Sequence, residues 1–304
     1  MFSGCTALVD APAIIPLSVM APYACKEMFY NCTSLTTAPK LPAETVATYC
    51  YEMMFYYCAS LTTAPELPAT TLANYCYNAM FRGCNSLAYI KCLATNISAT
   101  GCLGNWVYGV ASTGTFVKAP RNNSWSRGAS GIPTNWTVEN DKSDYSLLPL
   151  TFKALESGVF SFARPNTTYQ YLYYSLDAGL SWTQIPNGET DTPTIAAGKE
   201  ICWYSGIGPV YNYGIGTFSA TCDYEAYGNI SSLKNYNDFS LNAYKEYDDR
   251  HFQKLFYNNT HLLNAKNVIL TDEIDITLYC YSHMFDGCSN LTEAPQLPET
   301  WVPA

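Results

Sequence analysis

The sequence predicts an α+β fold, rich in β-structure, in which solenoid segments made of short repeats flank a small β-sandwich. Three observations lead to this prediction. A Phe-x-x-Cys motif recurs toward both ends of the chain, a stretch rich in tryptophan and glycine follows the first group of repeats, and the central stretch consists of short apolar or alternating runs. The 304 residues are enough for two or three domains with ample core.

The repeat is defined by the spacing of its phenylalanine and cysteine. The first interval is 27 residues and the next two are 26, and the pairs are Phe2/Cys5, Phe29/Cys32, Phe55/Cys58, Phe81/Cys84 and Phe285/Cys288. A period of roughly 20–29 residues with Leu, Asn or Cys at fixed places is the signature of leucine-rich repeats. Leu72, Cys76, Met80 and Cys84 stand four apart, which predicts a short helix. The following half, "SLTTAPELP" in one copy, predicts a short parallel strand ended by its proline.

Each predicted unit is apolar on one side only, so stacked units would bury that side in a continuous core. Residues 1–92 would hold about 3.5 such units, and residues 229–304 resume the pattern with Asn259 in the cysteine position.

The consensus "MFxxCxSLTTAPxLP" resembles the BspA-like (Treponema pallidum-type) leucine-rich repeat family of bacterial surface proteins. Cys50, Cys76 and Cys280 stand where that family usually has its first isoleucine, Met-Phe replaces Ala-Phe, and the period is slightly longer. The resemblance covers residues 1 to about 92 and about 229 to 304. It implies a repeat solenoid and a role in adhesion at a cell surface, and similar modules occur in phage tail-associated proteins.

The middle of the chain predicts two further segments. Residues 93–146, which contain Trp106, Trp125 and Trp136, are interpreted as a cap over the last repeat followed by a polar linker. Residues 147–228 predict a small β-sandwich, because short strand-like runs alternate with Gly, Pro and Asn turns. Within it, "SLDAGLSW" resembles the Asp-box, and that resemblance implies a structural hairpin turn formed by Ser175, Asp177, Gly179 and Trp182.

Composition narrows the class of partner. Only 13% of the residues are charged and the net charge is −9, so nucleic acid is an unsuitable partner, because phosphate binding needs clustered Lys and Arg. No apolar run reaches the roughly 18–20 residues of a membrane span. No signal peptide is visible, since no basic segment precedes the apolar residues 11–22.

Three states are open for the thirteen cysteines. Recurring positions favour buried thiols that stack like with like, and these structural ladders are Cys32, Cys50, Cys58, Cys76, Cys84, Cys280 and Cys288. Some disulfides are the alternative, with Cys202 and Cys222 as the first candidate pair. A metal site is disfavoured by the eight-residue spacing and by the presence of only three histidines. We predict no metal and no cofactor.

The sequence favours binding over catalysis. It contains no phosphate loop, no His-Glu-x-x-His and no Gly-x-Ser-x-Gly motif. Tyr, Asn, Ser and Thr are abundant, as in surfaces that recognise ligands by stacking and adaptable hydrogen bonds. Trp203, Tyr204, Tyr211 and Tyr213 are candidates for an aromatic platform that binds a sugar ring or a protein loop, and their alternative role is core packing.

Three functional hypotheses follow. The first is a non-enzymatic recognition or adhesion protein, extracellular or on a virion surface, that binds a host or cell-surface glycan or protein. The second is an assembly protein that associates head to tail through its repeat ends to form fibres or coats. The third is an accessory module of a glycan-processing enzyme, suggested by the Asp-box.

Overall fold

A computed structural model describes residues 1–120, 122–163, 171–186, 192–205, 215–233, 252–270 and 280–297. The chain divides into two compact units, Met1–Asp141 and Lys142–Ala304. The first unit contains the predicted repeats together with most of the predicted cap. The second combines the predicted sandwich with the resumed repeats.

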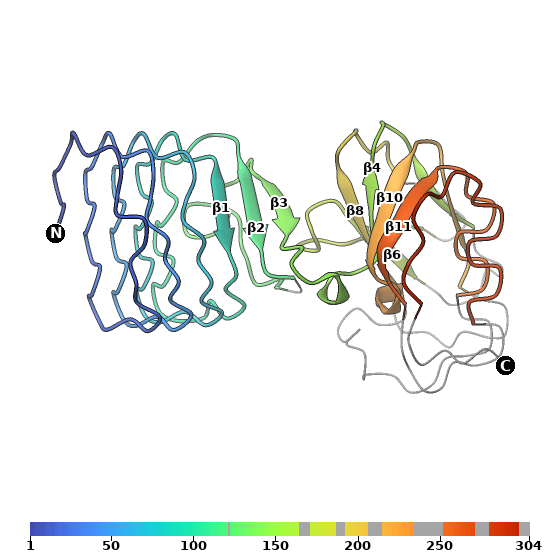
Figure 1. The fold of residues 1–304 in the computed structure, drawn as a ribbon, viewed down its shortest axis with the longest axis horizontal. Helices are drawn as coiled ribbons and strands as arrows, with labels where there is room; N and C mark the ends of the chain where they lie inside the picture. The colour runs from blue at the N-terminus through green and yellow to red at the C-terminus, as the bar shows by residue number, and fades with distance from the viewer. Residues whose placement is uncertain are drawn as a thin grey trace. The chain divides into compact units, whose positions relative to one another are not determined.

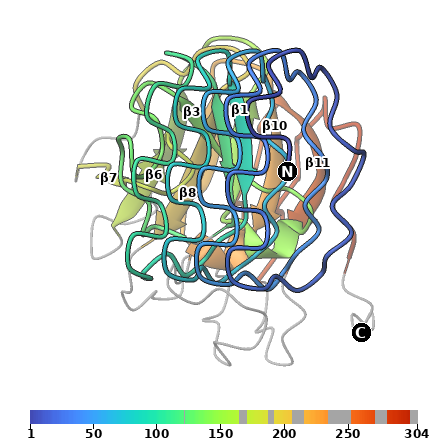
Figure 2. The same ribbon diagram turned by 90° about the vertical axis from the view of Figure 1, so that its left-hand side faces the viewer.

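The first unit is a stack of similar chain coils, seen from the side in Figure 1 and along the stack in Figure 2. One side of the stack is a parallel ladder. Earlier coils pair through single bridges such as Thr63 to Tyr89. The later ones form a three-stranded parallel sheet, in the order β1 (Tyr89–Cys92), β2 (Thr115–Lys118) and β3 (Thr137–Asn140).

The other side of each coil is a ribbon of consecutive β-turns, at residues 22–31, 48–57, 74–83 and 100–109. Along the ribbon, backbone N–H groups alternate between a carbonyl of the same coil and a carbonyl of the next coil. The N–H of Glu52 donates to the carbonyl of Tyr49 within the coil at 3.3 Å, and the N–H of Met53 donates to the carbonyl of Asn78 in the next coil at 2.9 Å. Half of the donors therefore close turns and half join coils, which satisfies the backbone without a helix.

The predicted α+β class is wrong. The described residues contain no α-helix, only the short 3-10 helices η1 (Tyr145–Leu147) and η2 (Ile230–Leu233), and the fold is almost entirely β with open sheets. The predicted leucine-rich-repeat solenoid of alternating helices and strands is wrong for the same reason, because turn ribbons stand where the helices were expected.

The spacing that suggested a helix has another cause. In the ribbon of residues 74–83, Tyr75, Ala79 and Gly83 have φ of 56°, 49° and 79°. A left-handed residue at every fourth position gives the ribbon a side-chain period of four. Over three turns, that period resembles the helical 3.6 closely enough to mislead.

Aromatic rings run through the core of the first unit. Phe2, Phe29, Phe55 and Phe81 stack in a column with ring centroids 5.4, 5.5 and 5.7 Å apart. Trp106 follows Phe81 at 6.1 Å, and Trp125 stacks on Trp106 at 5.9 Å. The tryptophans of the predicted cap therefore extend the core column of the repeats.

The second unit contains a six-stranded sheet, in the order β11-β10-β4-β8-β6-β7, and a two-stranded sheet of β5 and β9. Among the described strands of this unit, β10 and β11 form the only parallel pair. The strands are β4 (Thr151–Ala154), β5 (Phe160–Ala163), β6 (Leu172–Ser175), β7 (Thr183–Gln184), β8 (Glu200–Ser205), β9 (Thr217–Ala220), β10 (Tyr224–Asn229) and β11 (Leu262–Ile269).

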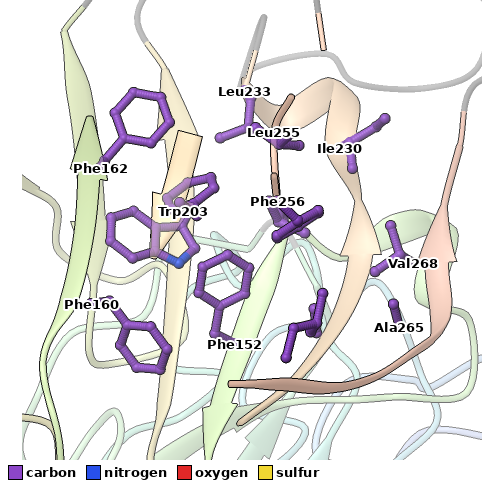
Figure 3. Packing of buried hydrophobic residues seen from close by; sticks show 14 of the residues in the cluster. Phe152, Phe160, Phe162, Trp203, Ile230, Leu233, Leu255, Phe256, Ala265 and Val268 are labelled. Atoms are coloured by element: carbon purple, nitrogen blue, oxygen red, sulfur yellow. The ribbon is translucent and has the colours of Figure 1, made fainter. Parts of the chain in front are cut away.

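The two sheets share an aromatic core, shown in Figure 3. Phe152 of β4 lies 5.4 Å from Phe160 of β5 and 4.9 Å from Phe218 of β9, measured between ring centroids. Trp203 of β8 lies 4.9 Å from Phe218. These rings are almost fully buried, and burial of each aromatic side chain contributes roughly 1.5–3 kcal/mol to stability.

The resumed repeats belong to this same core. Phe256 and Phe285 stack at 5.3 Å, and Phe256 lies 6.1 Å from Phe218. Asn259, which replaces the repeat cysteine, donates from Nδ2 to the carbonyl of Phe218 at 3.0 Å and to the Tyr224 hydroxyl at 2.8 Å. At this repeat position the side-chain amide of Asn259, in place of a cysteine thiol, therefore donates to a backbone carbonyl of a neighbouring segment.

Candidate functional site

The predicted aromatic platform is divided between core and surface. Trp203 is fully buried, and Figure 3 shows its indole in the core beside Phe152 and Phe256. Its candidate role in ligand binding is therefore wrong, because the alternation of side chains along β8 turns it inward. Tyr204, the next residue, lies on the outer face. Tyr211 and Tyr213 lie outside the described residues.

A different aromatic cluster surrounds Tyr204. Its ring stacks on Tyr173 of β6, directly across the strand pair, with centroids 4.7 Å apart and planes at 12°. Trp182 approaches Tyr204 edge-on at 5.2 Å. Gln184 of β7 lies opposite Tyr173 and is exposed. All three rings are half-buried, and burial raises the pKa of the Tyr204 hydroxyl.

The Asp-box residues form a closed hydrogen-bonded turn between β6 and β7. The Asp177 carboxylate accepts from the Ser175 hydroxyl at 2.8 Å, from the Ser181 amide at 2.9 Å and from the Ser181 hydroxyl at 2.7 Å. The amide of Gly179, with φ of 84°, donates to the Ser175 hydroxyl at 2.8 Å. The turn uses these groups internally and places Trp182 against Tyr204.

The ladder cysteines make hydrogen bonds between layers. The thiols of Cys32, Cys58 and Cys84 donate to the carbonyls of Phe2, Phe29 and Phe55 in the preceding coil, at 3.0, 3.1 and 3.0 Å. Cys288 makes the same contact to Phe256 at 2.9 Å in the second unit. A second ladder, Cys50 and Cys76, is fully buried, and Cys280 is buried in the second unit. Burial raises the pKa of the Cys50 thiol to about 11 and that of Cys58 to about 12, which keeps both thiols protonated and unreactive.

The structure does not join the suggested pair Cys202 and Cys222 in a disulfide. Cys202 lies in β8, where the Thr151 hydroxyl is 3.4 Å from its sulfur. Cys222 lies beyond β9 against Gly158, whose missing side chain leaves room for the thiol.

Two columns of tyrosines line the surface of the turn ribbons. Tyr23, Tyr49 and Tyr75 stack at 5.0 and 4.8 Å with nearly parallel planes. Tyr30 stacks on Tyr56 at 4.9 Å, and the Arg82 guanidinium continues that column. Because both faces of an inner ring such as Tyr49 are covered by its neighbours, the columns present ring edges and hydroxyls to solvent. They are therefore unsuited to stacking on sugar rings.

A cavity of about 620 Å³ with mixed polar and apolar walls opens where the last complete ribbon meets the segment that follows it. Its walls are neutral and rich in hydroxyl groups, and they are formed by Thr95–Ala99, Gly101–Gly104, Ser124, Ser126 and Ser130. The sequence did not reveal this cavity. The serine-rich stretch 122–131 is its only sign in the sequence, and the position of that stretch after the repeats predicts a cap instead.

The described residues contain no cluster of three His, Cys, Asp or Glu side chains that could hold a metal ion. No described helix is long and apolar enough to span a membrane. No family model, curated protein or solved structure matches this chain.

Proposed function

We propose that this protein is a non-enzymatic recognition protein of a cell or virion surface, which binds a glycan or protein receptor through the aromatic cluster of Tyr173, Tyr204 and Trp182. The observation that carries the proposal is the half-exposed cluster on the outer face of β6 and β8. Paired strands hold two of its rings, and the Asp-box turn holds the third. A rigid aromatic surface of this kind loses little conformational entropy when it binds.

The free thiols are compatible with an extracellular location. Disulfides normally form in oxidising compartments, but oxidation requires an accessible thiolate. Eleven of the thirteen cysteines are buried, Cys288 is partly buried, and Cys5 is exposed. Burial therefore protects most of them without pairing.

The test is to screen the labelled protein against an immobilised glycan array and to measure the affinity of the bound glycans by calorimetry. We expect Tyr204→Ala to weaken binding at least about tenfold, which corresponds to the loss of roughly 1.4 kcal/mol of stacking. Tyr204→Phe should retain binding because it keeps the ring. Tyr108→Ala, at a tyrosine that is 56% exposed on a turn ribbon, is the matched control.

Equal affinities for wild type and Tyr204→Ala would contradict the proposed site. Hydrolysis of a bound glycan would contradict the non-enzymatic role and favour the glycan-processing alternative.

Self-association is the second candidate function. In the coil of residues 1–22, four apolar side chains are 41–66% exposed, namely Val9, Ile14, Leu17 and Val19. An apolar surface of this kind favours contact with another copy of the chain. Light scattering over a range of concentrations measures it: growth of the particle mass that Val19→Lys suppresses supports assembly, and a constant monomer mass excludes it.

A further inference from the structure

The cavity in the first unit lies at an interruption of the hydrogen bonding between coils. In the ribbon of residues 74–83, the amides of Tyr75 and Tyr77 donate to the carbonyls of Thr100 and Cys102 in the next coil, each at 3.0 Å. The earlier ribbons are joined in the same way. Every second amide of one ribbon donates to every second carbonyl of the next.

In the ribbon of residues 100–109 only part of this row of amides donates to a neighbouring segment. The amide of Asn105 donates to the Ser130 hydroxyl at 2.9 Å, and the amide of Val107 donates to the carbonyl of Ala129 at 3.2 Å. The amides of Gly101 and Leu103, at the positions equivalent to Tyr75 and Tyr77, have no acceptor among the described residues. Both residues line the cavity.

We propose that this cavity binds an extended polypeptide segment, whose carbonyls two residues apart accept hydrogen bonds from the amides of Gly101 and Leu103. The bound segment would take the place that a further coil occupies elsewhere in the stack. Affinity would come from main-chain hydrogen bonds, as in other proteins that bind a peptide at an exposed backbone edge.

The cavity walls favour a neutral backbone as the ligand. Among the described residues no charged side chain lines the cavity, so only the two amides and the hydroxyls would offset the desolvation of a carboxylate or a phosphate. The hydroxyls of Ser124 and Ser126, which also line the cavity, can donate to or accept from a bound segment. The missing side chains of Gly101 and Gly104 accommodate the ring of Tyr75 and the amide of Asn78 in the preceding ribbon.

The site lies in the first unit and does not depend on the aromatic cluster of the second. Its test uses the full chain and a blocked hexapeptide, acetyl-Ala-Thr-Gly-Ser-Leu-Gly-amide. This peptide copies residues 99–104 with serine in place of cysteine, and it therefore contains the two carbonyls that accept from Tyr75 and Tyr77. Amide hydrogen exchange, resolved by residue with NMR, is the measurement.

We expect the amides of Gly101 and Leu103 to exchange faster than those of Tyr75 and Tyr77 in the free protein. Saturating peptide should slow the exchange of Gly101 and Leu103 at least about tenfold, the effect of one hydrogen bond of roughly 1.4 kcal/mol. The exchange of Tyr75 and Tyr77 should not change.

Ser124→Trp should abolish the peptide effect because the indole fills the cavity from an exposed position. Ser86→Trp, the same substitution at an exposed serine outside the cavity lining, is the control and should leave the effect intact. The inference is overturned if Gly101 and Leu103 are as protected as Tyr75 and Tyr77 without peptide, or if the peptide changes neither amide. Protection by N-acetylglucosamine but not by the peptide would also overturn it, and would identify a sugar site.

Discussion

The thiol of Cys58 lies 3.1 Å from the carbonyl oxygen of Phe29 in the preceding coil, and that oxygen also accepts the backbone N–H of Cys32 at 3.2 Å. The repeat cysteine is therefore a hydrogen-bond donor between coils as well as a small apolar side chain. Asn259 makes the equivalent contact in the second unit with an amide, which indicates that the donor matters at this position.

Substitution of Cys58 separates the two roles. If the thiol stabilises as a donor, Cys58→Ser should lower the free energy of unfolding less than Cys58→Ala, since serine keeps an O–H at the same place. We expect about 1–3 kcal/mol for the alanine variant, which loses the bond and leaves a small cavity. Denaturant unfolding measures both variants. An alanine variant that is more stable than the serine variant would mean that only the apolar character matters.

The buried thiols also predict a dependence of stability on pH. Desolvation raises the pKa of Cys50 from its usual value near 9 to about 11 in the folded protein. The unfolded chain therefore loses this proton first, so the contribution of Cys50 to stability is complete below pH 9 and is lost as the pH rises toward 11. Unfolding at pH 8 and pH 10.5 measures the loss. Cys50→Ala should show a smaller loss, and an equal loss in both proteins would contradict the assignment.

The left-handed positions of the ribbons predict opposite effects for two substitutions at one residue. Glu27 has φ of 54°, a conformation that asparagine tolerates and β-branched residues avoid. We expect Glu27→Val to lower the free energy of unfolding by about 1–2 kcal/mol and Glu27→Asn to leave it unchanged or raise it. Thermal unfolding compares them. Glu44→Val, at an exposed residue without positive φ, is the control, and an equal loss there would refute the backbone explanation.

The Asp-box turn predicts a purely structural role for Asp177. Its carboxylate accepts three hydrogen bonds within the turn, so Asp177→Ala should destabilise the protein by about 1–3 kcal/mol. Asp177→Asn should keep part of that stability. Calorimetric unfolding gives the stabilities, and glycan affinity well below the unfolding temperature should stay close to that of wild type. A loss of affinity in a variant of unchanged stability would instead assign Asp177 to the ligand.

The aromatic cluster brings together residues from separate parts of the sequence. Tyr204 and Trp182 were both identified from the sequence, in two separate motifs, but only the pairing of β6 with β8 brings them together. Tyr173 was not identified, because one tyrosine in a chain with 26 carries no signal of its own. Trp203 was placed in the same motif as Tyr204, and the alternation along β8 separates the two residues.

By itself, the sequence determined the period of about 26 residues and the positions that recur within it. A fixed spacing is a local property, and equivalent residues of stacked coils must meet. Phe29 and Phe55 therefore stack, and Cys58 reaches Phe29. The tertiary structure decided how the backbone between those positions is satisfied. A period of four residues fits both a helix and a turn ribbon. The ribbon forms because its alternate amides donate hydrogen bonds to carbonyls of the next coil. The cavity beside Gly101 and Leu103 is likewise tertiary, since its walls come from two separate stretches of the chain, residues 95–104 and 124–130.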